Sequence, residues 1–388
     1  MTERLYYNDS YLTGFQANVI GVGLETTHVY LDRTAFYPSS GGQPCDHGVL
    51  GGRAVMDVVD EEDRILHVVA QPLEHTGELT GTVNWARRFD HMQQHSGQHL
   101  LSAVLHELFN IATVSFHLGA ETCTIDIAAS TLQPEQIVAA EERANALIFE
   151  NRPVRVEYGQ SAEDLGLRKA TQREGTIRVV TIDGLDRIAC GGTHVRATGE
   201  IGLVLLRKLD KLRGNLRVEF LCGSRAVRQA RANYEGLSAV ARIFSATLED
   251  APALAQAQAE KALDAEKICK RLATELAQIR GRQRYLETPP NSAGLRRVVL
   301  RLPCLTEDVR IEAQSFTAGE KAIFIAVGED TPSILLASSK DSGLAAGERL
   351  KGLLAAIGGR GGGNSMLAQG SVSSKIELEN LVQALSDL

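Results

Sequence analysis

Two short stretches, far apart along the chain, carry most of its chemistry. Residues 95–99 are His-Ser-Gly-Gln-His, and residues 190–194 are Cys-Gly-Gly-Thr-His. On a helix, positions i and i+4 share one face, so His95 and His99 would point the same way. In the second stretch, the two glycines permit a tight turn that brings Cys190 and His194 around one point. Three imidazoles and one thiolate suit tetrahedral zinc, and the sequence therefore predicts a zinc site.

The first stretch lies within a predicted helix that also carries other histidines on the same face. We expect this helix to begin after Asp90 as N-cap, with Gln93 completing a capping box, and to end near Phe109. Its leucines lie on roughly the opposite face, so the histidines do not belong to the apolar face that packs into the core. The histidines of this row are His91, His95, His99 and His106. Because His91 and His95 have the same spacing as His95 and His99, spacing alone leaves both pairs open as ligands.

Several zinc enzymes are excluded by the residues around these histidines. No glutamate follows the first histidine, so the general base of a metalloprotease helix is missing. Neither His-x-Glu nor Cys-x-x-Cys occurs, which excludes a zinc deaminase. Zinc fingers also use paired Cys and His ligands, but these usually sit much closer together in the sequence. The long separation favours a site in the cleft of a large domain.

Composition indicates the number of domains and the cellular compartment. The chain has 388 residues, 44% of them hydrophobic, which allows two or three domains. Six cysteines are scattered without framework spacing, and neither a leader peptide nor a long apolar run is apparent. These features predict a protein of the reducing cytoplasm, without a membrane span.

The charges are distributed unevenly along the chain. Residues 1–200 contain 15 Lys and Arg against 27 Asp and Glu, whereas residues 201–388 contain 26 against 21. Within residues 205–301 the count is 19 basic to 10 acidic. A basic second half predicts contact with a polyanion. The alternative is a solvated, charge-rich helix, and composition does not decide between the two.

Hydrophobic patterning divides the chain into strand-rich and helix-rich parts. Residues 1–85 contain alternating segments that predict a small β-barrel or sandwich: Asn18–Gly23, His28–Arg33, Ala54–Val59, Arg64–Val69 and Leu79–Trp85. A mixed α+β region follows to about residue 222, with expected strands at Thr122–Ile127, Val154–Tyr158 and Thr176–Ile182 and a helix at Pro134–Asn151. The acidic group Asp57, Asp60 and Asp63 is expected in a charged hairpin.

The second half begins with helices and ends in an α/β domain. We expect helices at Arg225–Phe244 and over residues 253–287, the latter with a narrow apolar stripe at Ile268, Leu272, Leu276 and Ile279. A stripe this narrow is typical of a helical arm, which Pro289 and Pro290 would end. The last part alternates expected strands, Arg297–Leu302, Ala322–Val327 and Ser333–Ala337, with helices, Gly343–Ile357 and Lys375–Leu385. It contains a glycine-rich segment at residues 358–370.

One more motif completes a pattern that identifies a family. Residues 32–44 are Asp-Arg-Thr-Ala-Phe-Tyr-Pro-Ser-Ser-Gly-Gly-Gln-Pro, which alone would be only a barrel loop. Together with residues 88–101, Cys190–His194 and the glycine-rich segment, it resembles the free-standing alanyl-tRNA editing proteins of the AlaX type in their long form. These are similar to the editing and C-terminal parts of alanyl-tRNA synthetase. The resemblance spans nearly the whole chain, in the family's order.

The resemblance implies a fold with four parts. They are a β-barrel (residues 1–88), a zinc-containing α+β editing domain (89–245), a helical arm (246–290) and a C-terminal glycine-rich α/β domain (291–388). The aminoacylation domain of the synthetase is not expected. The resemblance also selects the zinc ligands, one ion per chain, and it decides against His91. The implied ligands are His95, His99, Cys190 and His194.

The implied activity is hydrolysis of mischarged tRNA for alanine, chiefly the seryl form and also the glycyl form. Ser40, Gly41 and Gly42 match an element that senses the substrate side chain. Nearness in sequence suggests Gln98, Ser115 and His117 as polar groups of the catalytic pocket. We expect tRNA contacts at Arg207, Lys208, Lys211, Arg213, Arg280, Arg282, Arg284 and Arg360. A homodimer through the arm and C-terminal domain is also implied.

Two competing functions remain to be weighed. One is a tRNA-binding accessory protein with a structural zinc and no turnover, because four protein ligands leave tetrahedral zinc no open place for water. The other is a phosphoesterase, which the type of C-terminal domain suggests. It is disfavoured because the sequence shows no aspartate-rich metal cluster.

Overall fold

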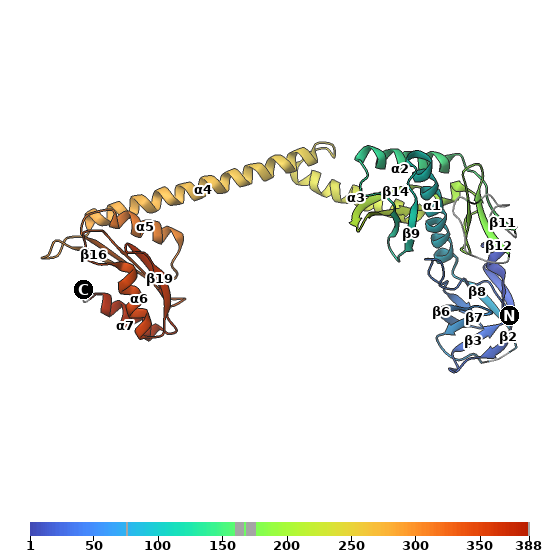
Figure 1. Ribbon diagram of the computed structural model, residues 1–388, viewed down its shortest axis with the longest axis horizontal. Helices are drawn as coiled ribbons and strands as arrows, with labels where there is room; N and C mark the ends of the chain where they lie inside the picture. The colour runs from blue at the N-terminus through green and yellow to red at the C-terminus, as the bar shows by residue number, and fades with distance from the viewer. Residues whose placement is uncertain (75–76, 160–166, 168–175, 387–388) are drawn as a thin grey trace. The chain divides into compact units, whose positions relative to one another are not determined.

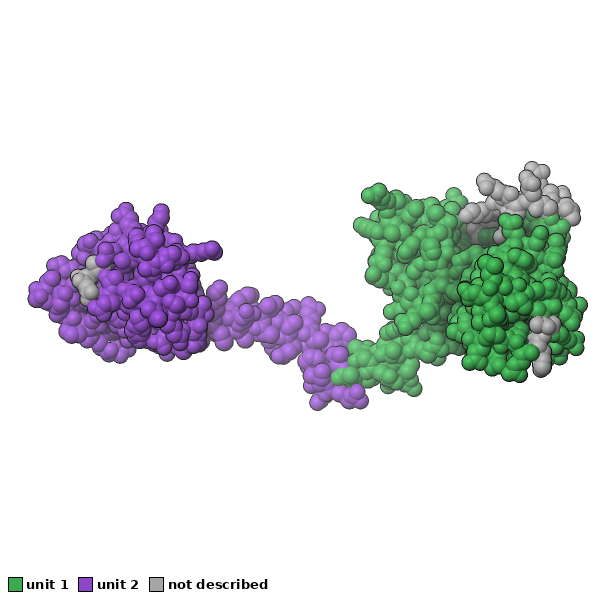
Figure 2. All heavy atoms as spheres, turned by 90° about the horizontal axis from the view of Figure 1, so that it is seen from below, with its two compact units in different colours: residues 1–239 green, residues 240–388 purple. Residues whose placement is uncertain are grey.

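A computed structural model describes residues 1–388 except 75–76, 160–166, 168–175 and 387–388. The chain forms two compact units, Met1–Ala239 and Val240–Leu388 (Figure 2). Each unit is a mixture of helices and strands (Figure 1). In the described part of the chain, no helix is long and apolar enough to cross a membrane.

The first unit begins with a closed β-barrel, which confirms the barrel over the sandwich. Its strands follow the order β2, β3, β7, β6, β5, β8, and their bounds are β2 Gly14–Val22, β3 His28–Leu31, β5 Gly48–Leu50, β6 Arg53–Glu61, β7 Arg64–Val69 and β8 Glu78–Val83. Phe15, Leu31, Phe36 and Ile65 fill its interior. Closure leaves no exposed edge strand. As predicted, the β6–β7 hairpin carries Asp57, Asp60 and Asp63.

Short elements surround the barrel. β1 (Glu3–Arg4) pairs in parallel with β4 (Arg33–Thr34), and the 3-10 helix η1 (Leu5–Tyr7) follows β1. The sequence patterns did not indicate these elements, because two or three residues are too few to show a periodicity.

Helix α1 (Trp85–Phe109) starts earlier than predicted. Its N-cap is Asn84, whose side chain accepts the N–H of Arg87 at 3.2 Å, so the prediction of Asp90 as N-cap was wrong. No residue between Trp85 and Asp90 breaks a helix, and the helix therefore begins at the earlier cap, directly after β8. Consequently His91 lies in the second turn and is buried, whereas we expected it at the first helical position.

The rest of the first unit packs two antiparallel sheets and α2 (Pro134–Phe149) around α1 (Figure 1). One sheet has the order β14, β15, β10, β9, with β9 Thr113–Leu118, β10 Cys123–Ile127, β14 Val204–Leu212 and β15 Asn215–Cys222. The other has the order β11, β12, β13, with β11 Val154–Gly159, β12 Ile177–Ile182 and β13 Asp186–Ala189. The 3-10 helix η2 spans Thr198–Ile201. Leu100, Leu101 and Val104 of α1 pack on Ile125 and Phe220 in the core.

Two helices follow, as predicted within two residues at each end. α3 spans Gly223–Phe244, so the boundary between the units falls within it, and α4 spans Ala251–Glu287. The four residues of the predicted apolar stripe on α4 are 47–59% exposed. Within the second unit, α4 packs against α5 (Glu307–Thr317), a helix that we did not predict.

The second unit contains a five-stranded sheet in the order β16, β17, β18, β20, β19. Its elements are β16 Arg296–Leu302, β17 Ala322–Gly328, β18 Ser333–Ser338, α6 Ala346–Ala356, β19 Arg360–Gly363, β20 Leu367–Ser371 and α7 Lys375–Ser386. Only β16 and β17 pair in parallel, with α5 as the connection between them. The glycine-rich segment forms the β19–β20 hairpin. Cβ atoms at Gly361 and Gly370 would come within 2.5 and 2.3 Å of Leu354, so glycine lets α6 approach the hairpin.

Candidate metal-binding site

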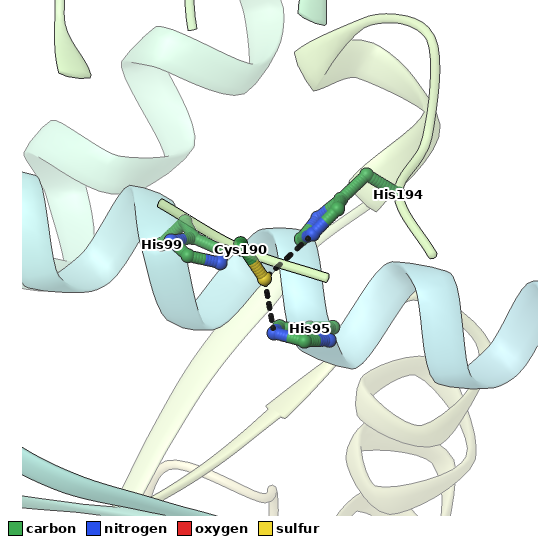
Figure 3. A group of neighbouring side chains, drawn as sticks. All are labelled: His95, His99, Cys190 and His194. Carbon is green, nitrogen blue, oxygen red and sulfur yellow. Dashed lines mark hydrogen bonds between the residues drawn. The ribbon is translucent and has the colours of Figure 1, made fainter. Parts of the chain in front are cut away.

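The four predicted zinc ligands converge on one point. Their ligand atoms all lie within 4.8 Å of one another (Figure 3). α1 supplies His95 and His99, and the loop between β13 and η2 supplies Cys190 and His194. The three histidines are buried and the cysteine is partly buried. His91 is outside this group, so the structure brings together the pair that the resemblance selected.

The ring nitrogens of two histidines are oriented toward the thiol. The Nε2 atoms of His95 and His194 lie 3.4 and 3.3 Å from Cys190 Sγ. On the other side of its ring, His95 Nδ1 lies 2.9 Å from Gln43 Oε1. An amide oxygen can only accept, so Nδ1 carries the proton and Nε2 keeps its lone pair for a ligand. His194 Nδ1 meets Ser96 Oγ at 3.2 Å.

The electrostatics of the cluster favour neutral rings. Burial, followed by the charge of His99, lowers the pKa of His95 well below its usual 6.5. Burial, followed by His95, does the same to the pKa of His194. Neutral imidazole is the form that binds metal. His91 also stays neutral near pH 7, because burial lowers its pKa to about 4.

The residues present fit a zinc ion by donor chemistry and by spacing. Zn–N bonds of about 2.0 Å and Zn–S bonds of about 2.3 Å at tetrahedral angles require nitrogen and sulfur to be roughly 3.5 Å apart. The two measured separations, 3.4 and 3.3 Å, are close to this value. The loop is also shaped to hold the first histidine, since a Cβ at Gly192 would come within 2.3 Å of His95 Cε1.

The Ser40–Gly41–Gly42 element is a tight turn beside this cluster. Ser40 and Gln43 exchange backbone hydrogen bonds of 3.0 and 2.9 Å across it. Gly41 and Gly42 have φ of +57° and +82°, the left-handed conformation that glycine adopts without strain. A Cβ at Gly42 would also lie 2.8 Å from Phe116 O, so two independent constraints require glycine there.

Gln43 connects this turn to both ligand segments. Its Oε1 accepts from His95 and from the N–H of Thr193 at 3.2 Å, and its Nε2 donates to Thr193 Oγ1 at 2.8 Å. Sequence analysis missed Gln43 as a site residue, and it missed Ser96 as well. The only signal was their position within the recognised motifs, because the contacts themselves join residues distant in sequence.

The three predicted catalytic residues lie in different surroundings. Gln98 is buried on α1 and donates to Ser102 Oγ at 2.8 Å. Ser115 and His117 alternate along β9 with Phe116, whose ring centroid lies 5.3 Å from that of His95. Successive strand residues face opposite sides of a sheet, so Ser115 and His117 face the side of β9 that Phe116 does not. Ser115 Oγ donates to Asp126 at 2.6 Å, and His117 Nε2 lies 3.7 Å from the same carboxylate.

The predicted tRNA contacts are mostly exposed, and some are already paired. In the first unit, Arg207 pairs with Glu219 at 3.1 Å and Lys208 with Asp210 at 2.8 Å. Lys211 and Arg213, beside the β14–β15 turn, are exposed. In the second unit, Arg280, Arg282 and Arg360 are exposed, whereas Arg284 donates to the buried Glu312 at 2.7 Å.

Comparison with known proteins places this fold and site in a class. Residues 177–219, which include Cys190 and His194, match the model of the threonyl and alanyl tRNA synthetase second additional domain. Residues 310–388 match the DHHA1 domain. The chain is thus related to proteins that carry accessory domains of these synthetases.

Individual relatives make the family specific. The chain is 30% identical to the alanyl-tRNA editing protein AlaX-L of Pyrococcus horikoshii, over 97% of this chain and 96% of that protein. It is 34% identical to the alanyl-tRNA editing protein Aarsd1 of Danio rerio, over 53% of this chain and 52% of that one. It is 30% identical to the alanine–tRNA ligase of Methanoregula boonei, over 95% of this chain and 41% of the ligase. The chain belongs to the alanyl-tRNA editing protein family of the AlaX-L type.

Proposed function

We propose that this protein hydrolyses the ester that joins a wrong amino acid to tRNA for alanine. The expected substrates are chiefly the seryl form and also the glycyl form. The observation that carries the proposal is the cluster of His95, His99, Cys190 and His194 in a chain of the editing family. The alignment with the Pyrococcus horikoshii protein covers both segments that supply the ligands.

The chemistry of the substrate explains why such an activity is useful. Serine differs from alanine by one hydroxyl, and an apolar pocket rejects an added hydroxyl poorly. A pocket that hydrogen-bonds that hydroxyl can discriminate by as much as ~10⁴-fold. We assign this sensing role to the turn at Ser40, Gly41 and Gly42, which Gln43 connects directly to the ligand His95.

The protein's own groups would mainly position the reactants, because an aminoacyl ester is already activated. Because four protein ligands fill a tetrahedral zinc, the ion would supply Lewis-acid chemistry toward a carbonyl only if its coordination number rose to five. Gln43 would keep the proton on His95 Nδ1, so that Nε2 remains available as a ligand. We retain Gln98 as a candidate for orienting water or the ribose; Ser115 and His117, on the face of β9 opposite Phe116, are not assigned that role.

The proposed substrate brings tRNA as partner. We expect several of the exposed cations predicted above to contact phosphates, so affinity should fall as salt rises because counterions are released on binding. We also propose a homodimer through the arm and C-terminal domain. Support comes from the stripe of Ile268, Leu272, Leu276 and Ile279, which is about half exposed on α4. Sedimentation of the purified protein would test whether it forms a dimer.

A deacylation assay tests the proposal. Alanine tRNA charged with serine, glycine or alanine is incubated with the protein, with and without a chelator, and the ester half-life is measured. We expect rapid loss of the seryl ester, with the activity abolished by chelator and by Cys190→Ala. Cys269→Ala removes an exposed thiol of α4 and should retain full activity.

The accessory-protein alternative predicts a different result in the same assay. There, zinc would be purely structural, tRNA would bind, and the ester half-life would be unchanged by protein in every sample. That outcome would overturn the proposed hydrolysis and leave tRNA binding in place.

A further inference from the structure

A groove in the first unit lies between the start of α1 and the start of α3. Two adjoining hollows, of 420 and 370 Å³, form it and share Ala120, Arg225 and Arg228 among their lining residues. We call it the arginine groove and define it by Trp85, Arg87, Phe89, His91, Arg225 and Arg228. Each hollow falls in the usual size range of ligand pockets.

The arginine groove carries unneutralised positive charge. Arg225 donates to Asp90 in hydrogen bonds of 2.9, 3.1 and 2.7 Å, and the charges of this ion pair cancel. Arg87 gives its Nε to the carbonyl of Cys45 at 2.9 Å, and Arg228 is exposed. Neither Arg87 nor Arg228 has a carboxylate partner within the described ranges. Glu121 also lines the second hollow but pairs with neither arginine in the described part of the chain, so two guanidinium groups remain available for an anion with more than one oxygen.

An aromatic surface lines the same groove. Trp85 is 38% exposed, which is unusual for so large an apolar ring. The ring centroids of Phe89 and Tyr11 lie 5.2 and 5.3 Å from that of Trp85 and support it from within the fold. Exposed aromatic rings next to arginines are typical of surfaces that stack unpaired bases.

A buried histidine points to a missing partner at this groove. His91 is only 2% exposed and lines the first hollow. Its Nδ1 has no hydrogen-bond partner among the residues that the structure describes. Buried ring nitrogens are nearly always hydrogen-bonded, so a polar atom of a ligand would satisfy it.

We propose that the arginine groove binds an unpaired nucleotide of the tRNA together with its neighbouring phosphate. The base stacks on Trp85, the phosphate meets Arg87 and Arg228, and a polar atom of the nucleotide reaches His91. This inference rests on the proposed function, which supplies tRNA as the partner. His91 lies one turn of α1 before His95, so the groove adjoins the metal-binding site, but none of the four ligand residues lines either hollow.

The test uses a reporter that the chain already contains. Trp85 is its only tryptophan, so tryptophan fluorescence, excited selectively over the eight tyrosines, reports on the surroundings of this one side chain. The full-length protein is titrated with uncharged alanine tRNA and with a four-nucleotide single-stranded RNA. Affinity is measured in parallel by the anisotropy of labelled RNA across a range of salt. Arg228→Gln is compared with Arg231→Gln, which removes the same charge from an exposed position on the same helix.

We expect both RNAs to quench Trp85. Arg228→Gln should weaken binding about fivefold and reduce the slope of log K against the logarithm of the salt concentration by about one. Arg231→Gln should change neither quantity. If tRNA binds with unchanged fluorescence and the two variants have equal affinity, the proposed nucleotide site in the groove is wrong, while the proposed function stays intact. Equal quenching by polyglutamate, with displacement of the RNA, would assign the groove to an acidic polypeptide instead. Failure to bind tRNA at all would overturn both proposals.

Discussion

Replacing Arg88 should destabilise the first unit far more than replacing a surface arginine. Arg88 and Asp46 form an ion pair in which both side chains are fully buried. The guanidinium also donates to the carbonyls of Ser10 at 2.8 Å and Ala35 at 2.6 Å. Arg88→Met would leave the Asp46 carboxylate buried without its counterion, which costs about 3–5 kcal/mol. With a urea m-value of about 2.5 kcal/mol/M, the unfolding midpoint should fall by about 1.5 M.

The assay follows urea unfolding by the fluorescence of Trp85, which lies in the same unit. Arg64→Met is the matched control, because Arg64 pairs with Glu61 at an exposed site where ion pairs contribute ~0–1 kcal/mol. The double variant Arg88→Met, Asp46→Leu removes both charges and should recover most of the lost stability. If Arg88→Met and Arg64→Met cost the same, or if the double variant is the sum of its parts, the unpaired buried charge is not the cause.

Two further predictions concern the barrel. Burial lowers the pKa of His67 from 6.5 to about 4, so its contribution to stability is fully present above pH 6.5 and is lost as pH falls toward 4. Between pH 7.5 and 4.5 the free energy of unfolding should fall by about 2–3 kcal/mol through this group, and His67→Gln should flatten that part of the profile; an unchanged profile would refute it. Gly42→Ala should cost about 1–3 kcal/mol more than Gly52→Ala, because both have positive φ but only Gly42 would place a Cβ 2.8 Å from Phe116 O. Equal melting temperatures for these two variants would contradict that reasoning.

Local rules predicted much of the candidate site, because its parts are local. Helical spacing puts His95 and His99 on one face, and glycines let Cys190 and His194 meet, whatever the rest of the fold does. That the two pairs form one site was inferred from the preference of zinc for nitrogen and sulfur ligands, and only the choice of His99 over His91 followed from the resemblance to a family. The contacts of Gln43 could not be predicted, since they join residues 52 and 150 positions apart.

The elements that were mispredicted or missed have specific physical causes. The start of α1 shifted because Asn84, at the end of β8, caps the helix before Asp90 can. The β19–β20 hairpin is glycine-rich, and glycine has a low intrinsic preference for strands. Its strands form because the absence of side chains at Gly361 and Gly370 lets Leu354 of α6 pack against the hairpin. Strand formation in this hairpin is therefore set by tertiary packing, and it leaves no periodic signal in the sequence.

The site is shared between the barrel and the α+β core, and this sharing constrains how it can work. Gln43 belongs to the turn that the barrel contributes, and it contacts one ligand of α1, His95, and a residue next to another, Thr193. The buried pair of Arg88 and Asp46 fixes the loop that carries this turn to the same helix, since Asp46 also accepts the N–H of Tyr37. A displacement of the turn therefore moves the lone pair of His95 as well. Under the proposed function, the element that senses the amino acid and the ligands that hold zinc form one rigid assembly, so substitutions in the turn should alter both together.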